Sequence, residues 1–551
     1  MPRTSPFEEG SPLSKIALVG EAPAKQEMRM GRPFVGPAGA VLDECMHAAG
    51  LIRRQCYITN VFECECFKKK ASQSNIYRKS DSALLWSQKG SFTAAGVEYV
   101  ARLKDRLDRC KANVFVALGA PALDALTSLS GILKWRGSIL ESDMLDGGRK
   151  VVPTIHPAAV LQGQYIWRYL IIYDLRRVRS EAASSSIRLP VRDLIVEPTF
   201  QECIDFLLSL EGKPRVAFDV EIYNGQISCI SFSSDPKLAI SIPFLDRYRH
   251  DYWSVHQEME LWETIARLLA NPSSLKINQN ILFDMFMLLY RMGIHTKGPI
   301  ADTMVAFNLM YVDFKKGLDI ITSLYTREPY YKDEGKIWRN PFRDMTAFWR
   351  YNAKDAACAL EAWLAMEPEL RSGGYRATHD ETVAMYDPLL FMMIRGLRVD
   401  NSRLAEARDR LKLDLQHKMD SLREIADFPF NALSPKQCQQ YFYIHKGARP
   451  YVSPKTGQVT TDDLALARLW RRHHWPEIKL VQEIRTLNKL GGTYYDVTLD
   501  KDNRLRGSYN PRGTWTGRLS SSETVFGTGL NLQNLDPSFK AFIVPDEETV
   551  A

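Results

Sequence analysis

Two acidic side chains stand two residues apart in RVAFDVEIYNG, at Asp219 and Glu221. In a β-strand this spacing directs both carboxylates to one face, where they repel each other unless a cation lies between them. KINQNILFDMF adds Asp284, and YNAKDAACALEAW adds Tyr351 and Asp355 at i and i+4 on an expected helix face. Together, the acids of these three segments predict a site for hard divalent cations.

Such a site can hydrolyse a phosphodiester. Two cations about 4 Å apart can activate a water molecule and stabilise the leaving oxygen, and Tyr351 is suited to orient that water. A lone Asp-x-Glu pair is more often a solvated turn. An ordered set of Asp-x-Glu, Asn-x-x-Phe-Asp and Tyr-x-x-x-Asp is rare by chance, and it resembles the three motifs of the DEDDy 3′-to-5′ exonucleases, the proofreading domains of many DNA polymerases.

The exonuclease resemblance implies a ribonuclease H-like fold and two Mg or Mn ions. It assigns metal binding to Asp219, Glu221, Asp284 and Asp355, and the orientation of water to Tyr351.

The elements around these acids are expected to alternate in type. RVAFDVEI, ISCISFSS and KLAISIPF are β-rich runs separated by turn residues, and helical patterns follow at 255–271, 280–293 and 345–366. This combination predicts an α/β unit that ends near residue 370.

A second group of polar residues lies in the glycine- and proline-rich loops of KIALVGEAPAKQEMRMGRPFVGPAGAVLDECM. A strand followed by Gly-Glu-Ala-Pro occurs in many α/β proteins. Here CYITNVF, NVFVALGAPAL and VVPTIHPAAVL follow it in the order and approximate spacing of the family 4 uracil-DNA glycosylases, over about residues 14 to 172. The resemblance implies a three-layer α/β domain that binds a uracil flipped out of the base stack.

The residues at the matching positions suit uracil chemistry. Phe34 is expected to stack on the base, and the Asn60 amide to accept from N3–H and donate to O4, a pattern that cytosine reverses. His156 is expected to hydrogen-bond O2 as negative charge builds on the departing base. Glu21 is expected to position water or to offset charge on the sugar.

Two more residues belong to the expected pocket, and a third departs from the family. Gly20 is assigned to substrate binding, and Glu27 stands where a group against C5 excludes thymine. Ala24 replaces the glycine usual after Gly-Glu-Ala-Pro, so one loop amide is expected to sit differently. Excision is the favoured activity, and the alternative is a non-catalytic uracil-sensing and DNA-gripping subunit of a split polymerase.

The cysteines indicate reduced thiols, because their odd number and wide scatter do not suit a disulfide framework. They are Cys45, Cys56, Cys64, Cys66, Cys110, Cys203, Cys229, Cys358 and Cys438. Glycosylases with a four-iron cluster carry two cysteines before the first strand, where this chain has none, and only Cys64 matches a ligand position. We therefore expect no iron–sulfur cluster.

The remaining third of the chain resembles the family A DNA polymerases, which are related to bacterial DNA polymerase I. ETVAMYDPLLFMMIRGLRVD, FNALSPKQ, KTGQVTTDDLAL, IRTLNKLGGTYYD and TWTGRLSSSETVFGTGLNLQNLD follow one another in that family's order. Two long helical stretches resemble the thumb, which grips duplex DNA mainly by its phosphates. The expected DNA contacts, each of which could equally be a plain surface residue, are Lys489, Arg518, Ser520, Asn531, Gln533 and Asn534.

The last residues, AFIVPDEETVA, resemble the entrance to the palm strand of these polymerases. The first metal-binding aspartate is expected directly after Ala551, so we expect a thumb with an incomplete palm and no nucleotidyl transfer by this chain alone. Either a second polypeptide carries the palm and fingers, or the chain is a fragment of a longer protein. A phage-type polymerase is the expected source.

Length and composition fit several α/β domains in one chain of 551 residues, 45% of them apolar. A small polar stretch, RRVRSEAASSSIRLPVRD, marks the first boundary. We predict a glycosylase-like domain over 1–180, a linker over 181–192, an exonuclease domain over 193–372, and a mostly α polymerase thumb with the start of the palm over 373–551.

Charge and hydropathy are compatible with a DNA-binding protein. The net charge of +7 is a mild excess that favours an anionic partner. No apolar window is long enough for a membrane span, and MPRTSPFEEGSPLSK lacks the apolar core of a secretory signal. We expect a cytoplasmic protein, in the host cytoplasm if phage-encoded, that binds single-stranded and primer–template DNA and no membrane.

Overall fold

The computed structural model describes residues 8–63, 92, 94–339 and 345–546. The chain forms two compact units, Met1–Val383 and Ala384–Ala551. Among the described residues, no helix combines the length and the apolar character needed to cross a bilayer. Cys64, Cys66 and the expected palm entrance at Ala551 lie outside the described residues.

The amino-terminal part of the first unit is built on one sheet of six strands: β1 (Glu8–Glu9), β2 (Ile16–Gly20), β3 (Cys56–Asn60), β4 (Val114–Leu118), β5 (Leu140–Glu141) and β6 (Lys150–Thr154). Their order is β1-β3-β2-β4-β6-β5, and the four inner strands are parallel. All four inner strands are entirely buried, and β2 and β4 are wholly apolar, because helices cover both faces of the sheet.

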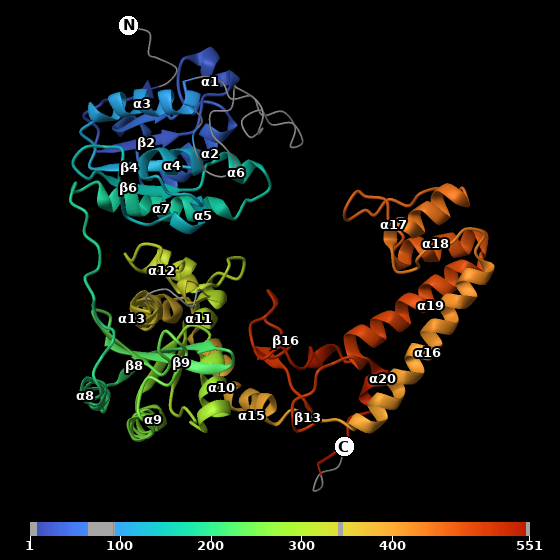
Figure 1. Ribbon diagram of the computed structural model, residues 1–551. Coiled ribbons are helices and arrows are strands. Elements are labelled where there is room, and N and C mark those ends of the chain that lie inside the picture. The colour runs from blue at the N-terminus through green and yellow to red at the C-terminus, as the bar shows by residue number, and fades with distance from the viewer. Residues whose placement is uncertain (1–7, 64–91, 93, 340–344, 547–551) are drawn as a thin grey trace. The chain divides into compact units, whose positions relative to one another are not determined.

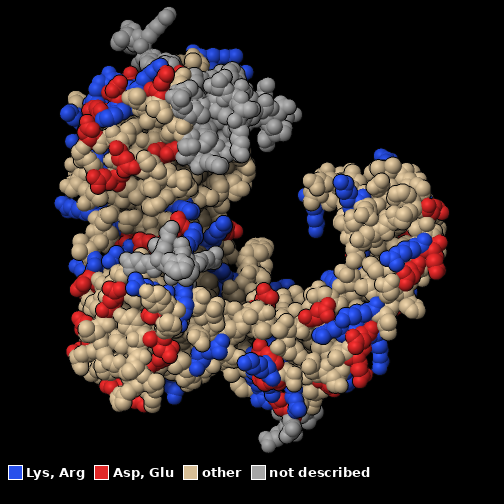
Figure 2. Space-filling view, viewed as in Figure 1, with Lys and Arg blue, Asp and Glu red and all other residues tan. Residues whose placement is uncertain are grey.

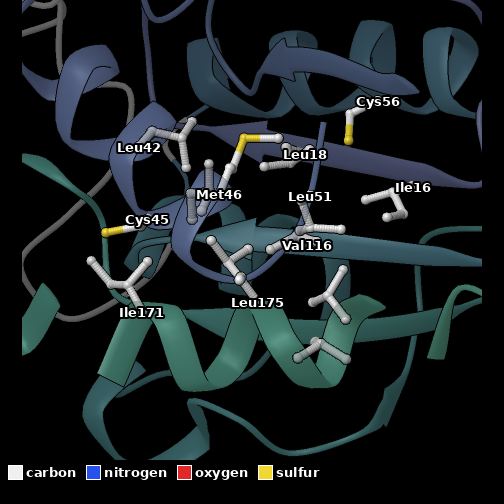
Figure 3. Packing of buried hydrophobic residues seen from close by; sticks show 14 of the residues in the cluster. Ile16, Leu18, Leu42, Cys45, Met46, Leu51, Cys56, Val116, Ile171 and Leu175 are labelled. Atoms are coloured by element: carbon white, nitrogen blue, oxygen red, sulfur yellow. The ribbon is translucent and has the colours of Figure 1, made fainter. Parts of the chain in front are cut away.

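Helices α2 (Pro37–Ala48) and α7 (Trp167–Glu181) pack on one face of this sheet, and α3 (Ala94–Asp108) and α4 (Ala120–Thr127) on the other (Figure 1). Figure 3 shows Met46 of α2 and Leu175 of α7 beside Val116 of β4 in the first of these cores. The shorter helices are α1 (Lys25–Met30), η1 (Arg53–Gln55), α5 (Ile132–Trp135) and α6 (Ala158–Leu161). The expected three-layer α/β fold is confirmed.

A second sheet follows in the same unit, with strands β7 (Asp193–Ile195), β8 (Arg215–Tyr223), β9 (Gln226–Asp235), β10 (Leu238–Pro243), β11 (Leu275–Asn278) and β12 (Ile300–Asp302). The order is β12-β11-β8-β9-β10-β7. The strands β8, β9 and β10 form an antiparallel meander, and β11 runs parallel to β8. The three predicted strands are therefore confirmed, whereas the sequence pattern did not reveal β7, β11 or β12.

The helices around this sheet are α8 (Phe200–Leu210), α9 (Val255–Ala270), α10 (Ile281–Met292), α11 (Thr303–Met310), α12 (Leu318–Tyr325), η3 (Glu334–Arg339), α13 (Thr346–Ser372) and α14 (Arg376–Ala384). Thr199 and Ser254 begin α8 and α9 with capping boxes. The long helix α13 packs across β8, β9 and β10. It continues past the predicted end because Met366 and Leu370 remain buried.

The second unit is mostly helical, as expected, and its long helices α16 (Asn401–Ile425) and α19 (Pro476–Leu490) pack against each other. Its other helical segments are α15 (Tyr386–Arg395), α17 (Pro435–Gln439), η4 (Gln440–His445), α18 (Asp463–His473), η5 (Gly491–Tyr495), η6 (Leu532–Asn534) and α20 (Pro537–Lys540). Its strands are β13 (Leu397–Arg398), β14 (Arg504–Leu505), β15 (Ser508–Asn510) and β16 (Ser520–Ser522).

Candidate active sites

A pocket of about 300 Å³ lies at the carboxyl ends of the parallel strands of the first sheet. Glu21 follows β2, Asn60 ends β3, and His156 comes shortly after β6. The strand β2 pairs with β3 on one side and β4 on the other, and open α/β sheets bind ligands at such a point. Phe34 and Glu27, which the sequence also assigned to a pocket, line the same cavity.

Phe34 and His156 contribute two rings to the pocket, with centroids 5.8 Å apart and planes 33° from parallel. Phe34 has a φ of +51°, a left-handed conformation that costs a bulky residue roughly 1–3 kcal/mol. Arg53 supports it, since its guanidinium donates to the Phe34 carbonyl (3.0 Å) and the Pro33 carbonyl (2.7 Å). Glu9 in turn holds Arg53 through a 2.7 Å ion pair. No motif in the sequence points to Arg53.

Asn60 and Glu21 bring polar atoms that need a partner. Asn60 is only 2% exposed, and neither its Oδ1 nor Glu21 Oε1 has a hydrogen-bond partner within the described chain. Leaving such a buried acceptor unpaired costs about 1–3 kcal/mol. Arg106 donates to the Asn60 backbone carbonyl at 2.8 Å and fixes the strand end. The pocket therefore favours a ligand that donates hydrogen bonds to both side chains.

Gly20 contributes to the pocket by lacking a side chain. A Cβ atom placed there would lie 2.4 Å from Asn60 Oδ1 and 2.4 Å from the Phe34 ring. The strand end therefore needs glycine so that the amide and the ring can approach each other.

Glu27 is locked by three backbone amides. Its carboxylate accepts hydrogen bonds from the N–H groups of Ala24 (3.2 Å), Val35 (3.0 Å) and Gly36 (2.7 Å). These hydrogen bonds join the start of α1 to the loop that carries the Phe34 ring. The expected role of Glu27 against C5 stays a prediction, and the sequence did not reveal its structural role.

His156 is held as an acceptor on one side of its ring. The Ala158 N–H donates to His156 Nδ1 at 3.2 Å. In the neutral ring this contact assigns the proton to Nε2, which makes Nε2 a hydrogen-bond donor.

The predicted exonuclease acids come from three elements. Carboxylate oxygens of Asp219 and Glu221 on β8 and of Asp355 on α13 all lie within 4.8 Å of one another. Asp284 joins from α10, where its Oδ1 accepts the Val220 N–H at 2.8 Å. A cluster with only oxygen donors suits Mg or Mn rather than a soft metal.

The electrostatics of this cluster also fit a divalent cation. Burial, together with the charge of Asp355, raises the pKa of Asp219 to about 7. Burial and the charge of Asp219 raise the pKa of both Glu221 and Asp284 well above their usual range. Acids that are this crowded and desolvated resist ionisation unless a cation compensates them.

Amide and hydroxyl groups orient the first of these acids. Asn352 Nδ2 donates to Asp219 Oδ2 at 2.9 Å, and Ser241 Oγ donates to Asn352 Oδ1 at 2.8 Å. Asn352 and Ser241 were not predicted. Asn352 directly follows the predicted Tyr351 in the sequence, but this position alone does not predict a contact with Asp219.

Tyr351 and Asp355 lie on one face of α13, and two further residues contact them. Lys332 Nζ lies 2.6 Å from Asp355 Oδ2 and 3.3 Å from the Tyr351 hydroxyl, and the Tyr331 hydroxyl donates to Asp355 Oδ1 at 2.6 Å. A Cβ at Gly335 would lie 2.9 Å from the Tyr351 ring, so glycine makes room for the phenol. Lys332 and Tyr331 stand at no characteristic spacing from the acids, so no motif predicts them.

The described cysteines are all free thiols. Cys45 and Cys56 donate to the backbone carbonyls of Arg168 (3.8 Å) and Ile52 (3.7 Å). Figure 3 shows them on opposite sides of the labelled core cluster. These two thiols therefore share no ligand site.

The predicted DNA contacts lie in the second unit. Ser520 begins β16, and Leu532 of η6 donates its N–H to Ser521 Oγ at 3.2 Å, which brings the two predicted segments together. The Asn531 side chain caps η6 by accepting the Gln533 N–H at 3.0 Å. The exposed residues of the set are Lys489, Arg518, Gln533 and Asn534. On the face in Figure 2, basic and acidic side chains are interspersed.

Comparisons with known proteins identify the family of the amino-terminal part of the chain. The uracil DNA glycosylase superfamily model matches residues 7–171. The type-4 uracil-DNA glycosylase of Thermotoga maritima is 32% identical over 175 residues, which cover 31% of this chain and 80% of that protein. The chain belongs to the type-4 uracil-DNA glycosylase family. Its glycosylase domain is the part that contains the pocket of Phe34, Asn60 and His156.

Two further family models match beyond the glycosylase domain: 3′-5′ exonuclease over residues 198–371 and DNA polymerase family A over residues 401–548. DNA polymerase I of Rhizobium leguminosarum is 30% identical over 282 residues, 49% of this chain and 27% of that protein. The DNA polymerase of Escherichia phage T5 is 25% identical over 408 residues, 66% of this chain and 45% of that protein. The chain thus spans less than half the length of either polymerase.

Proposed function

We propose that this chain excises uracil from DNA and shortens DNA 3′ ends by metal-dependent hydrolysis, as the amino-terminal part of a family A polymerase. The proposal rests on the pocket at the ends of β2 and β3, where the buried atoms Asn60 Oδ1 and Glu21 Oε1 have no hydrogen-bond partner among the described residues and the Phe34 ring lines the same cavity. The carboxylate cluster of Asp219, Glu221 and Asp355 supports the second activity.

Recognition of uracil follows from the chemistry of the pocket. The Phe34 ring offers a rigid stacking face, because the carbonyl contacts of Arg53 hold its loop in one conformation. Asn60 Oδ1 accepts from uracil N3–H while its Nδ2 donates to O4. Cytosine has an acceptor at N3 and a donor at N4, so it would leave this amide unpaired at both atoms, which disfavours it strongly.

Cleavage of the glycosidic bond leaves electrons on the base. His156, with its proton on Nε2, donates to uracil O2 as that oxygen gains negative charge. Glu21 orients water or offsets positive charge on the sugar. Glu27 stands as the group that excludes the C5 methyl of thymine, and it needs no movement because backbone amides already fix its carboxylate.

For the exonuclease, Asp219, Glu221, Asp284 and Asp355 are suited to hold two Mg or Mn ions. When bound, such ions supply Lewis-acid activation of water and stabilisation of the leaving oxygen. Asn352 keeps the Asp219 carboxylate directed into the cluster. The Tyr351 hydroxyl orients the attacking water, and burial raises its pKa, so the phenol keeps its proton.

The second unit is proposed to grip primer–template DNA. The exposed side chains of Lys489 and Arg518 are suited to phosphate contacts, and those of Gln533 and Asn534 to base or sugar edges. The second polypeptide expected to supply palm and fingers stays a prediction. Primer extension tests this prediction: the purified chain alone should not extend a primer, whereas the chain together with a copurifying partner should.

The proposal is tested with the purified chain and a single-stranded oligonucleotide that contains one uracil, in EDTA. Wild type should produce alkali-labile abasic sites, and Asn60→Ala should not. Binding of the oligonucleotide without abasic sites would instead favour uracil sensing. With Mg²⁺ present, wild type and Asn60→Ala should both shorten 3′ ends, and Asp219→Ala should lose only that activity.

A further inference from the structure

Lys332 supplies a positive charge to the exonuclease acids. Its Nζ lies 2.7 Å from Asp355 Oδ1 and 2.6 Å from Oδ2, and only 20% of the side chain is exposed. Lys354, a nearby lysine, instead pairs with Glu334 at 3.1 Å.

The residues beside Lys332 are bound to the glycosylase domain. The Tyr330 ring packs edge-on against Trp135 of α5 with centroids 5.4 Å apart, and the Tyr330 N–H donates to Ser138 Oγ at 3.2 Å. Asp333 pairs with Lys134 at 2.9 Å. The segment therefore contacts both domains: Tyr330 and Asp333 contact the glycosylase domain, and the two residues between them, Tyr331 and Lys332, contact Asp355.

The contact continues on the amino-terminal side of this segment. Arg177 of α7 donates to the Thr326 carbonyl at 2.7 Å. Arg327 pairs with Glu181, which also binds Lys150 at 2.8 Å. The chain from Thr326 to Asp333 is thus fixed to the glycosylase domain at several points before and after it reaches the exonuclease acids.

We propose that segment 330–333 is a strap by which the glycosylase domain holds Lys332 against Asp355, where the ammonium competes with divalent cations for the exonuclease site. This inference rests on the proposed metal-dependent exonuclease. An ammonium and a divalent cation draw on the same carboxylate oxygens, so each weakens the binding of the other. The glycosylase domain therefore lowers the metal affinity of its neighbour, and release of the strap raises it.

The test measures Mn²⁺ binding to the full chain without DNA, from the electron paramagnetic resonance signal of free Mn²⁺. Lys332→Met should bind Mn²⁺ about tenfold more tightly than wild type, equivalent to about 1.4 kcal/mol. Lys213→Met removes the same charge from an exposed position of the exonuclease domain and should leave binding unchanged. Equal or weaker binding by Lys332→Met overturns the proposal.

The role of the glycosylase domain is tested by substitutions of its own residues that contact the strap. Trp135→Ala should tighten Mn²⁺ binding several-fold. Combined with Lys332→Met, it should tighten binding no further than Lys332→Met alone. The variant should still excise uracil, which shows that the glycosylase domain is folded. Tyr165→Ala, at an exposed tyrosine of the same domain, is its control. If Trp135→Ala does not fold, Lys134→Met breaks the surface pair with Asp333 and should shift binding in the same direction, about twofold. Unchanged binding in a folded variant of either kind refutes the strap.

Failure of the proposed exonuclease is distinguished by one more variant. Asp219→Ala should abolish tight Mn²⁺ binding, with or without Lys332→Met. If Mn²⁺ binding does not depend on Asp219, the proposed metal site itself is refuted. If binding depends on Asp219 but is unchanged in Lys332→Met, only the strap is refuted.

Discussion

Gly20 lies opposite Asn60 in the parallel pairing of β2 and β3. The missing side chain of Gly20 is what allows the Asn60 amide and the Phe34 ring to meet at the bottom of the pocket. A backbone position thus decides whether the Asn60 amide and the Phe34 ring can line one cavity.

Gly20→Ala should abolish uracil excision. The added Cβ would lie 2.4 Å from Asn60 Oδ1, so the amide must move. We expect a loss of about 100-fold or more in kcat/KM, equivalent to about 2.7 kcal/mol or more, measured as abasic-site formation with folding checked by circular dichroism. Gly492→Ala adds a methyl group that meets nothing within 4 Å and should excise normally. Normal excision by Gly20→Ala would refute the assigned pocket.

Arg53→Met should weaken uracil binding more than it slows cleavage. The methionine keeps the length of the side chain but cannot donate to the Phe34 and Pro33 carbonyls, so the strained loop relaxes. We expect KM to rise about tenfold, equivalent to about 1.4 kcal/mol. Steady-state kinetics on a uracil-containing oligonucleotide measures it, and an unchanged KM would show that Phe34 holds its conformation without Arg53.

Gly335→Ala should impair the exonuclease alone. Its Cβ would lie 2.9 Å from the Tyr351 ring and would displace the phenol. We expect Mg²⁺-dependent 3′ shortening to fall about as far as in Tyr351→Phe, by roughly 10²-fold or more, with uracil excision intact. Equal loss of both activities would indicate general unfolding instead.

Glu181→Gln should destabilise the first unit in a pH-dependent way. Burial raises the pKa of Glu181, but hydrogen bonds from Arg327 and Lys150 outweigh it and lower the pKa. A carboxylate with a lowered pKa stabilises the fold above the pKa it has when unfolded, and that stabilisation is lost as the pH falls through its folded value. The variant should be about 3 kcal/mol less stable at neutral pH.

The difference between wild type and Glu181→Gln should shrink as the pH falls below about 4. Thermal unfolding of both proteins between about pH 3 and pH 8 measures this difference in stability. A difference that does not change with pH would mean that the charge of Glu181 does not stabilise the fold.

The candidate site residues could be predicted because their type and spacing form short motifs. Asp219 with Glu221 and Tyr351 with Asp355 each share one face of a single element, so local periodicity is enough. The strand β11 escaped prediction because Leu275–Asn278 is too short to show alternation.

The supporting residues could not be predicted, since their contacts depend on tertiary packing. Arg53 reaches the carbonyl of Phe34 from another segment, and the three amides on Glu27 follow from loop geometry. Lys332 contacts Asp355 from a segment in which the neighbouring Tyr330 packs on Trp135, almost 200 residues earlier in the chain. No periodic pattern encodes such contacts.

We propose that one chain carries two separable active sites, with uracil read by Asn60. The most direct test of this proposal is the yield of alkali-labile sites in uracil-containing single-stranded DNA, in EDTA, for wild type, Asn60→Ala and Asp219→Ala. We predict that wild type and Asp219→Ala form equal numbers of abasic sites and that Asn60→Ala forms fewer by a factor of about 100 at least. Wild-type protein that forms no abasic sites, or Asn60→Ala that forms them at the wild-type rate, would contradict it.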